Sequence, residues 1–214
     1  MPPITQPSPQ VHDLLLLQSG ITSFADVVKP VWITSLPAGK IWGVVRRATA
    51  PDGLVAVGVR GVNRQQRWGG FADLVHIIDR LRPSQLSSNR TCPTRGRVPA
   101  LAALCWLEGQ LNKSELEWGP VGSVGFELAT GQQVVTGTSD LDIAVFAPTR
   151  FTRDTARHIW SLMKAAPTKI DVLVETPYCG FSLEEYAREE SKKVLVRLPE
   201  GWQFATDPWD ISVI

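Results

Sequence analysis

Two carboxylates, Asp140 and Asp142, stand two residues apart in the segment Val134–Ala147, whose sequence is VVTGTSDLDIAVFA. The segment is rich in β-branched residues and is predicted to form a strand, in which alternate side chains share one face. Two like charges held so close repel each other unless a cation lies between them. Because Mg²⁺ prefers carboxylate oxygens together with the oxygens of substrate phosphates, the pair predicts a magnesium site. The simpler interpretation is a solvated strand edge that ends in a turn.

Gly122 and Ser123 precede this strand and point to a phosphate ligand. We expect them to form a flexible turn whose backbone N–H groups can approach a phosphate. Sixteen residues separate Ser123 from Asp140, so Gly131–Thr138 is expected to form a loop between the turn and the acidic pair.

A third carboxylate stands in the segment Lys169–Glu175, which is predicted to form a second strand beside the first. Asp171 is the preferred candidate to complete the site. Glu175 has the same parity along the strand and is the alternative, because alternate residues share a face. The sequence leaves the choice between them open.

The remaining periodicity predicts a mixture of helices and strands, typical of a small α/β or α+β domain. The segment 74–81 is apolar, and its periodicity does not decide whether it forms a strand or a short helix. The other elements expected are a β-hairpin formed by residues 41–48 and 54–59, and helices over 99–111, 155–164 and 183–193.

The segment Ser84–Gly96 is rich in Ser, Asn, Arg, Thr, Pro and Gly and predicts a connection between two domains, residues 1–90 and 91–214. The net charge of +1 hides an asymmetry between the two parts of the chain. Residues 1–97 carry 12 Lys/Arg against 5 Asp/Glu, and residues 98–214 carry 10 against 16. The basic part is suited to phosphates or an acidic partner. The excess of positive charge in this part is modest and few aromatic residues are interleaved with it, which argues against a nucleic-acid partner.

Five arginines lie around the predicted hairpin and the loop after it, where their guanidinium groups are suited to bind phosphates or an acidic protein: Arg46, Arg47, Arg60, Arg64 and Arg67. An ordinary solvated basic surface is the alternative. Trp68, in the same loop, is the best candidate among the eight tryptophans to stack on an adenine, although aromatic residues more often belong to a core.

The apolar run Leu14–Leu17 is far too short to span a membrane, and no basic region precedes it, so no membrane segment or signal peptide is expected. Cys92, Cys105 and Cys179 cannot all pair within one chain and lack the spacing of metal ligands. They indicate a reducing, cytoplasmic location.

The order of a Gly-Ser turn, an Asp-x-Asp strand and a single-Asp strand resembles the nucleotidyltransferase superfamily, which includes the polymerase-β-like enzymes. The resemblance implies an α+β fold, with a C-terminal polymerase-β-like catalytic domain built on a mixed sheet and a smaller α+β domain before it. It also implies that metal ions clamp a triphosphate.

Longer strings resemble a narrower family, the phosphoribosyl-dephospho-CoA transferases of bacterial malonate decarboxylase. They are HDLL from His12, VVRRA from Val44, VGVRGVNRQQRW from Val57, WGPVGSVGFELATG from Trp118, SDLDI from Ser139 and IDVLVETPYCGFSLEEYAR from Ile170. This resemblance assigns metal binding to Asp140, Asp142 and Asp171, and positioning of a triphosphate to Gly122 and Ser123.

The reaction that this resemblance implies moves a prosthetic group. The 2'-(5''-phosphoribosyl)-3'-dephospho-CoA group passes from 2'-(5''-triphosphoribosyl)-3'-dephospho-CoA to a serine of the apo acyl carrier protein subunit of malonate decarboxylase, with release of pyrophosphate. Two alternatives are the same transfer to the carrier protein of citrate lyase and a non-catalytic nucleotide-binding module.

Overall fold

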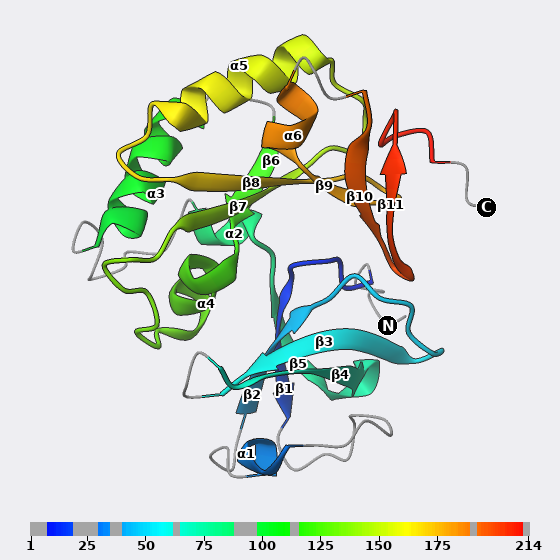
Figure 1. The fold of residues 1–214 in the computed structure, drawn as a ribbon. Coiled ribbons are helices and arrows are strands. Elements are labelled where there is room, and N and C mark those ends of the chain that lie inside the picture. Colours follow the sequence, from blue (N-terminus) through cyan, green and yellow to red (C-terminus); the bar gives the residue numbers. More distant parts are fainter. Residues whose placement is uncertain are drawn as a thin grey trace, which may run out of the picture. The chain divides into compact units, whose positions relative to one another are not determined.

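The computed structural model describes residues 8–18, 30–34, 40–61, 65–87, 98–111, 116–188 and 192–211. The chain divides into two compact units, Met1–Leu81 and Arg82–Ile214, each with its own sheet (Figure 1). Helices and sheets occur together, so the predicted α+β class is confirmed. The boundary expected after residue 90 falls within residues 88–97, outside the described part of the chain.

The first unit is built on one antiparallel five-stranded sheet, in the order β4-β3-β2-β1-β5. The predicted hairpin is confirmed as β2 and β3, and the ambiguous segment 74–81 forms a 3₁₀ turn followed by a strand. The elements are β1 (Leu14–Gln18), α1 (Val31–Thr34), β2 (Lys40–Val45), β3 (Leu54–Arg60), β4 (Arg67–Asp73), η1 (Leu74–His76) and β5 (Ile77–Leu81).

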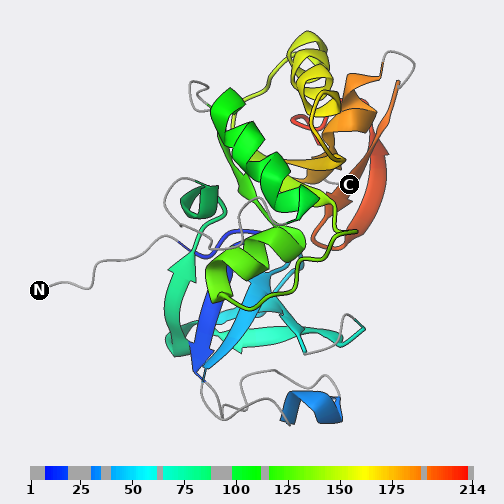
Figure 2. The same cartoon turned by 90° about the vertical axis from the view of Figure 1, so that its left-hand side faces the viewer.

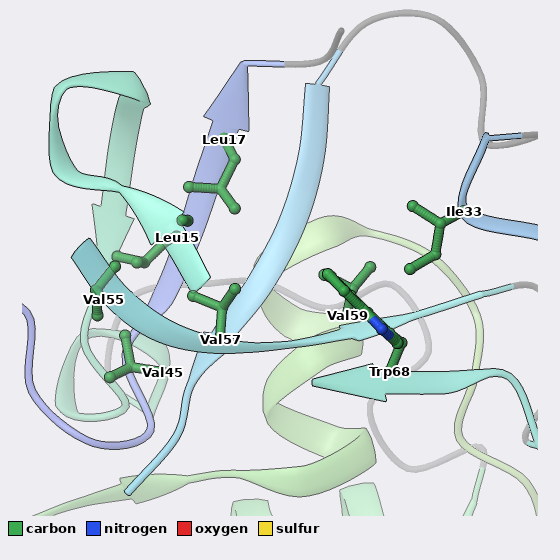
Figure 3. Close-up of a cluster of buried hydrophobic side chains, with 9 residues drawn as sticks. Leu15, Leu17, Ile33, Val45, Val55, Val57, Val59 and Trp68 are labelled. Carbon is green, nitrogen blue, oxygen red and sulfur yellow. The ribbon is translucent and has the colours of Figure 1, made fainter. Parts of the chain in front are cut away.

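One face of this sheet forms the hydrophobic core of the first unit, shown in Figure 3. Alternation along each strand sends every second side chain to it. The cluster consists of Leu15, Leu17, Ile33, Val45, Val55, Val57, Val59, Trp68 and Ala72. Trp68 is only 9% exposed, so its predicted stacking role is wrong. The basic loop expected there is strand β4, whose alternation directs the indole inward.

A buried ion pair ties the start of β1 to β5. Asp13 is 1% exposed, and its Oδ2 lies 2.6 Å from Nε of Arg80 and accepts the backbone N–H of Gln10 at 2.7 Å. His12, immediately before it, has a φ of 74° and donates its N–H to the carbonyl of Val45. The His-Asp dipeptide therefore fixes the entry of the chain into the sheet.

Removing one partner of a buried pair leaves the other charge uncompensated. We expect Asp13→Ala to lower the free energy of unfolding by about 3 kcal/mol, measured by urea denaturation. Asp79→Ala, an exposed carboxylate on β5, is the matched control and should change stability little. Equal losses in the two variants would contradict a structural role for the buried pair.

The second unit contains a mixed six-stranded sheet in the order β11-β10-β9-β8-β7-β6. Its strands are β6 (Glu117–Pro120), β7 (Leu141–Phe146), β8 (Ile170–Glu175), β9 (Gly180–Ser182), β10 (Val194–Leu198) and β11 (Gly201–Ala205). β7 and β8 are parallel and the other pairs are antiparallel. A parallel pair needs a crossover connection, and the helix α5 (Arg153–Lys164) supplies it.

The other helices of this unit are α2 (Ser84–Ser87), α3 (Pro99–Leu111), α4 (Gly122–Thr130) and α6 (Leu183–Ala187). α5 and α6 lie on one side of the sheet and α4 lies on the other (Figure 1 and Figure 2). None of the helices in the described ranges is long and apolar enough to cross a membrane.

The expected elements of this unit are partly confirmed. The helix over 99–111 is confirmed, although Cys105 is exposed and does not belong to its buried side. The helix over 183–193 is wrong in length: α6 ends at Ala187 because Arg188 is extended, with φ −67° and ψ 131°. The strand over 134–147 begins only at Leu141.

Candidate active site

Asp142 and Asp171 face each other across the parallel strands β7 and β8. Their Cα atoms are register partners in the ladder, so both side chains leave the same face of the sheet. Leu141 and Ile143, on either side of Asp142, are fully buried and fix its orientation. The structure thus brings together two of the three predicted carboxylates.

Gly122 lies directly against the Asp142 carboxylate. A Cβ atom built on Gly122 would lie 2.2 Å from Oδ2 of Asp142, so a larger residue cannot occupy this position without displacing the carboxylate. The φ of Gly122 is 59°, which L residues rarely adopt. The backbone N–H of Val121 donates to the carbonyl of Asp142 at 2.9 Å and holds the two segments together.

The predicted Gly-Ser turn is in fact the first turn of helix α4, which begins at Gly122. The N-cap residue is Val121, whose aliphatic side chain makes no capping hydrogen bond. The N–H groups of a first helical turn have no acceptor within the helix, and they favour an anion. Gly122 and the half-buried Ser123 therefore place such donors beside Asp142.

Asp140 is exposed and immediately precedes β7 instead of lying within it. The expected loop is present, since residues 131–140 contain no helix or strand. Glu127, buried in α4, anchors this loop by accepting the N–H groups of Val134 and Val135, both at 2.8 Å. Sequence reasoning missed Glu127, although a single carboxylate inside an apolar helix is a signal that could have found it.

Lys169 places a positive charge beside Asp171 and was also missed. Its Nζ lies 2.8 Å from Oδ2 of Asp171. The hydrogen bond and charge of Asp171 raise the pKa of Lys169 above its ordinary value of 10.5, and Asp140 adds to the effect. The ammonium group therefore stays protonated at neutral pH. A Lys-x-Asp spacing at the start of a strand was the available sequence signal.

Glu175, the alternative third carboxylate, lies at the other end of β8. Its register partner is Phe146 and not Asp142, and the strand separates it from Asp171 by about 13 Å. It is 6% exposed and lies against Gly180 of β9. The geometry favours Asp171 over Glu175, and the metal-binding roles themselves stay predictions.

Hard oxygen donors suit Mg²⁺, which uses one or two protein carboxylates and completes its octahedron with water and phosphate oxygens. Asp142 and Asp171 provide two such donors in register, with Asp140 beside them. Within the described residues, no group of three or more His, Cys, Asp or Glu side chains is arranged to hold a metal ion. The magnesium site stays a prediction, and an ion there would take several of its ligands from water and a bound phosphate.

The predicted phosphate-binding arginines belong to the first unit. Arg60 and Arg67 are register partners on β3 and β4, Arg46 and Arg47 follow β2, and Arg64 lies outside the described residues. The structure therefore pairs Arg60 with Arg67 across the two strands, and the Arg46 side chain lies against Gly58 and Gly69 of the same strands.

Comparison with known proteins matches both units. Residues 10–83 match the model of the phosphoribosyl-dephospho-CoA transferase MdcG N-terminal domain, and residues 85–208 match that of the C-terminal domain. These two matches meet near the division between the units of the structure. No solved structure matches the chain.

Curated relatives match almost the whole chain and carry the same name, phosphoribosyl-dephospho-CoA transferase. The protein of Pseudomonas aeruginosa is 39% identical over 208 residues, which is 96% of each chain. The Pseudomonas putida W619 protein is 38% identical over 95% of this chain and 97% of its own. That of Azotobacter vinelandii is 35% identical over 94% of each.

These matches make the protein a transferase, an α+β enzyme with two units. The chain belongs to the phosphoribosyl-dephospho-CoA transferase (MdcG) family, and the predicted family resemblance is confirmed.

Two glycines separate the effect of backbone strain from that of crowding Asp142. Gly131, with a φ of 74°, has open space where a Cβ would stand, whereas Gly122 has the Asp142 carboxylate there. We expect Gly131→Ala to lower the free energy of unfolding by about 1–2 kcal/mol through strain alone. Gly122→Ala should lose a further ~1–3 kcal/mol from overpacking. Urea denaturation measures both, and equal losses would show that the carboxylate is not held against Gly122.

Proposed function

We propose that this protein transfers the phosphoribosyl-dephospho-CoA group from 2'-(5''-triphosphoribosyl)-3'-dephospho-CoA to a serine of the apo acyl carrier protein subunit of malonate decarboxylase, releasing pyrophosphate. The observation that carries the proposal is the register pairing of Asp142 with Asp171 beside the start of α4. Carboxylates and free backbone N–H groups are the two kinds of group that a metal-bound triphosphate needs. Membership of the family supports the identity of the transferred group.

The reaction would form one phosphorus–oxygen bond and break another. The acceptor serine oxygen attacks the phosphorus attached to the ribose, the bond from that phosphorus to the β-phosphate oxygen breaks, and pyrophosphate leaves. The serine proton passes to a carboxylate or to water. The N–H groups of Gly122 and Ser123 would hold phosphate oxygens, and Asp142 would orient the reacting phosphate.

We propose that Asp142 and Asp171, which are in register, supply ligands to Mg²⁺ together with Asp140 from the loop before β7, and that phosphate oxygens and water complete the shell. When bound, the ion would neutralise charge on the triphosphate and on the departing pyrophosphate. The arrangement of an uncapped helix start, an acidic strand and a second acidic strand parallel to it supports assignment of the second unit to the nucleotidyltransferase fold. A cytoplasmic location belongs to the same proposal, and neither Cys105 nor Cys179 forms a disulfide with another residue that the structure describes.

Mass spectrometry of the apo carrier subunit, incubated with enzyme, Mg²⁺ and the triphosphate precursor, tests the transfer. We expect Asp142→Ala and Asp171→Ala to reduce it by about 100-fold or more, since each removes a ligand of the ion. Asp154→Ala, an exposed carboxylate on α5, should leave it unchanged. An unmodified serine with the wild-type enzyme would overturn the proposal. If the enzyme modifies the citrate lyase carrier protein in preference in the same assay, that carrier is the acceptor instead of the malonate decarboxylase subunit.

Lys169 competes with a metal ion for Asp171, so its removal has a predictable sign. We expect Lys169→Gln to strengthen Mg²⁺ binding by about two- to fivefold, the range of an exposed ion pair. Calorimetric titration with Mg²⁺ measures the change, and Lys164→Gln, on the exposed surface of α5, is the control. Weaker Mg²⁺ binding in Lys169→Gln would show that the lysine helps to retain ligands instead of competing with the ion.

A further inference from the structure

The sheet of the second unit has one face that packs against α6 and another that carries the candidate carboxylates. Val174, Phe181 and Val196 are neighbouring register partners on β8, β9 and β10, and all three are fully buried. The ring of Phe181 lies against α6. Because side chains alternate along a strand, the residues between these three leave the opposite face, which is the face of Asp142 and Asp171.

Two aromatic side chains of β11, Trp202 and Phe204, leave the sheet on the face of the carboxylates. Gln203, between them, is the register partner of the buried Val196, so its two neighbours point the other way. Trp202 is 70% exposed and Phe204 is 59% exposed, and their ring centroids lie 6.2 Å apart at an interplanar angle of 82°. A perpendicular pair uses at most one face of each ring, so the indole offers an open face to a ligand.

One continuous sheet face joins the carboxylates to the aromatic pair. Helix α4 packs on β6 and β7 at one edge of the sheet, whereas β11 is the strand at the other edge (Figure 1). Between them the face is lined by the half-buried side chains of Leu173, Ser182 and Leu195. Three strand spacings separate β8 from β11, which is about 14 Å. A ligand that extends from Asp171 to β11 would therefore stay on the second unit.

We propose that Trp202 stacks on the purine base of a nucleotide whose reacting phosphates lie beside Asp142 and Asp171. The inference rests on the proposed function, because the proposed donor carries an adenine that two riboses join to its triphosphate. The base must then lie beyond the reacting phosphate, on the part of the site away from the start of α4. Every base has a π face, and an exposed aromatic side chain binds it by stacking.

Arg197 places a positive charge beside the aromatic pair. It is exposed and is the register partner of Trp202, so both side chains leave the same face. The carboxylate in this row of the sheet, Glu175, is buried against Gly180 and lies two strands away from Arg197. A guanidinium group next to an indole suits a nucleotide, which combines a planar base with phosphates, better than an uncharged apolar segment.

Calorimetric titration of the full chain with 3'-dephospho-CoA, in the absence of Mg²⁺, tests the site independently of transfer. We expect Trp202→Ala to weaken binding by about tenfold and to change the thermal stability little, because the side chain is mostly exposed. Tyr178→Ala removes another exposed aromatic side chain of the same unit and should bind as wild type does. 4'-Phosphopantetheine, which lacks the base, should bind equally to wild type and to Trp202→Ala.

Two further variants separate stacking from simple apolar contact. Trp202→Phe keeps an aromatic face and should weaken binding of 3'-dephospho-CoA by no more than about threefold. Trp202→Leu keeps only the apolar surface and should lose as much affinity as Trp202→Ala. Equal affinity in the Phe and Leu variants would show that no base stacks on this side chain and would overturn the inference.

The remaining outcomes separate this inference from the proposed function. The site fails if wild type does not bind 3'-dephospho-CoA, if Trp202→Ala binds it equally well, or if that substitution weakens 4'-phosphopantetheine to the same extent. It also fails if Trp202→Ala raises the KM for the carrier subunit and leaves the KM for the precursor unchanged, which would assign β11 to the protein partner. If binding of 3'-dephospho-CoA depends on Trp202 but the wild-type enzyme does not modify the carrier subunit, the site stands and the proposed function fails.

Discussion

Parallel pairing of β7 with β8 brings the carboxylates of Asp142 and Asp171 into register, and much of the second unit serves to maintain that arrangement. Two negative charges on adjacent strands repel each other. Lys169 offsets part of this repulsion through its ion pair with Asp171. The buried Leu141 and Ile143 prevent β7 from slipping by one residue, which would turn Asp142 into the core.

The acidic strands could be predicted from the sequence because strand parity is simple and local. Asp142 and Asp171 each lie between two apolar residues, which marks the strand and its buried face. The segment of α3 has a complete helical pattern with Pro99 at its first turn. The alternation of side chains along one strand does not determine how β7 and β8 align with each other, because that register depends on the crossover through α5. The register is what favours Asp171 over Glu175.

The failures have equally specific causes. β4 reads RWGGFAD, and its two glycines and two charged ends conceal a strand that sends Trp68 into the core. Those glycines have separate functions, because Gly70 faces the Trp68 ring and Gly69 makes room for Arg46. The segment 183–193 has a helical composition, but the extended backbone at Arg188 ends α6 early. Lys169 and Glu127 were overlooked because each gains its role only through a contact made in the folded chain.

Helix α4 is tied to the candidate site at two points. Its first residue lies against Asp142, and Glu127 in its second half fixes the loop that leads to Asp140. The helix has only nine residues, so the two contacts are joined by a short and rigid element. A substitution that shifted α4 would therefore disturb the Asp142 carboxylate and the loop before Asp140 together, because one packed helix carries both contacts.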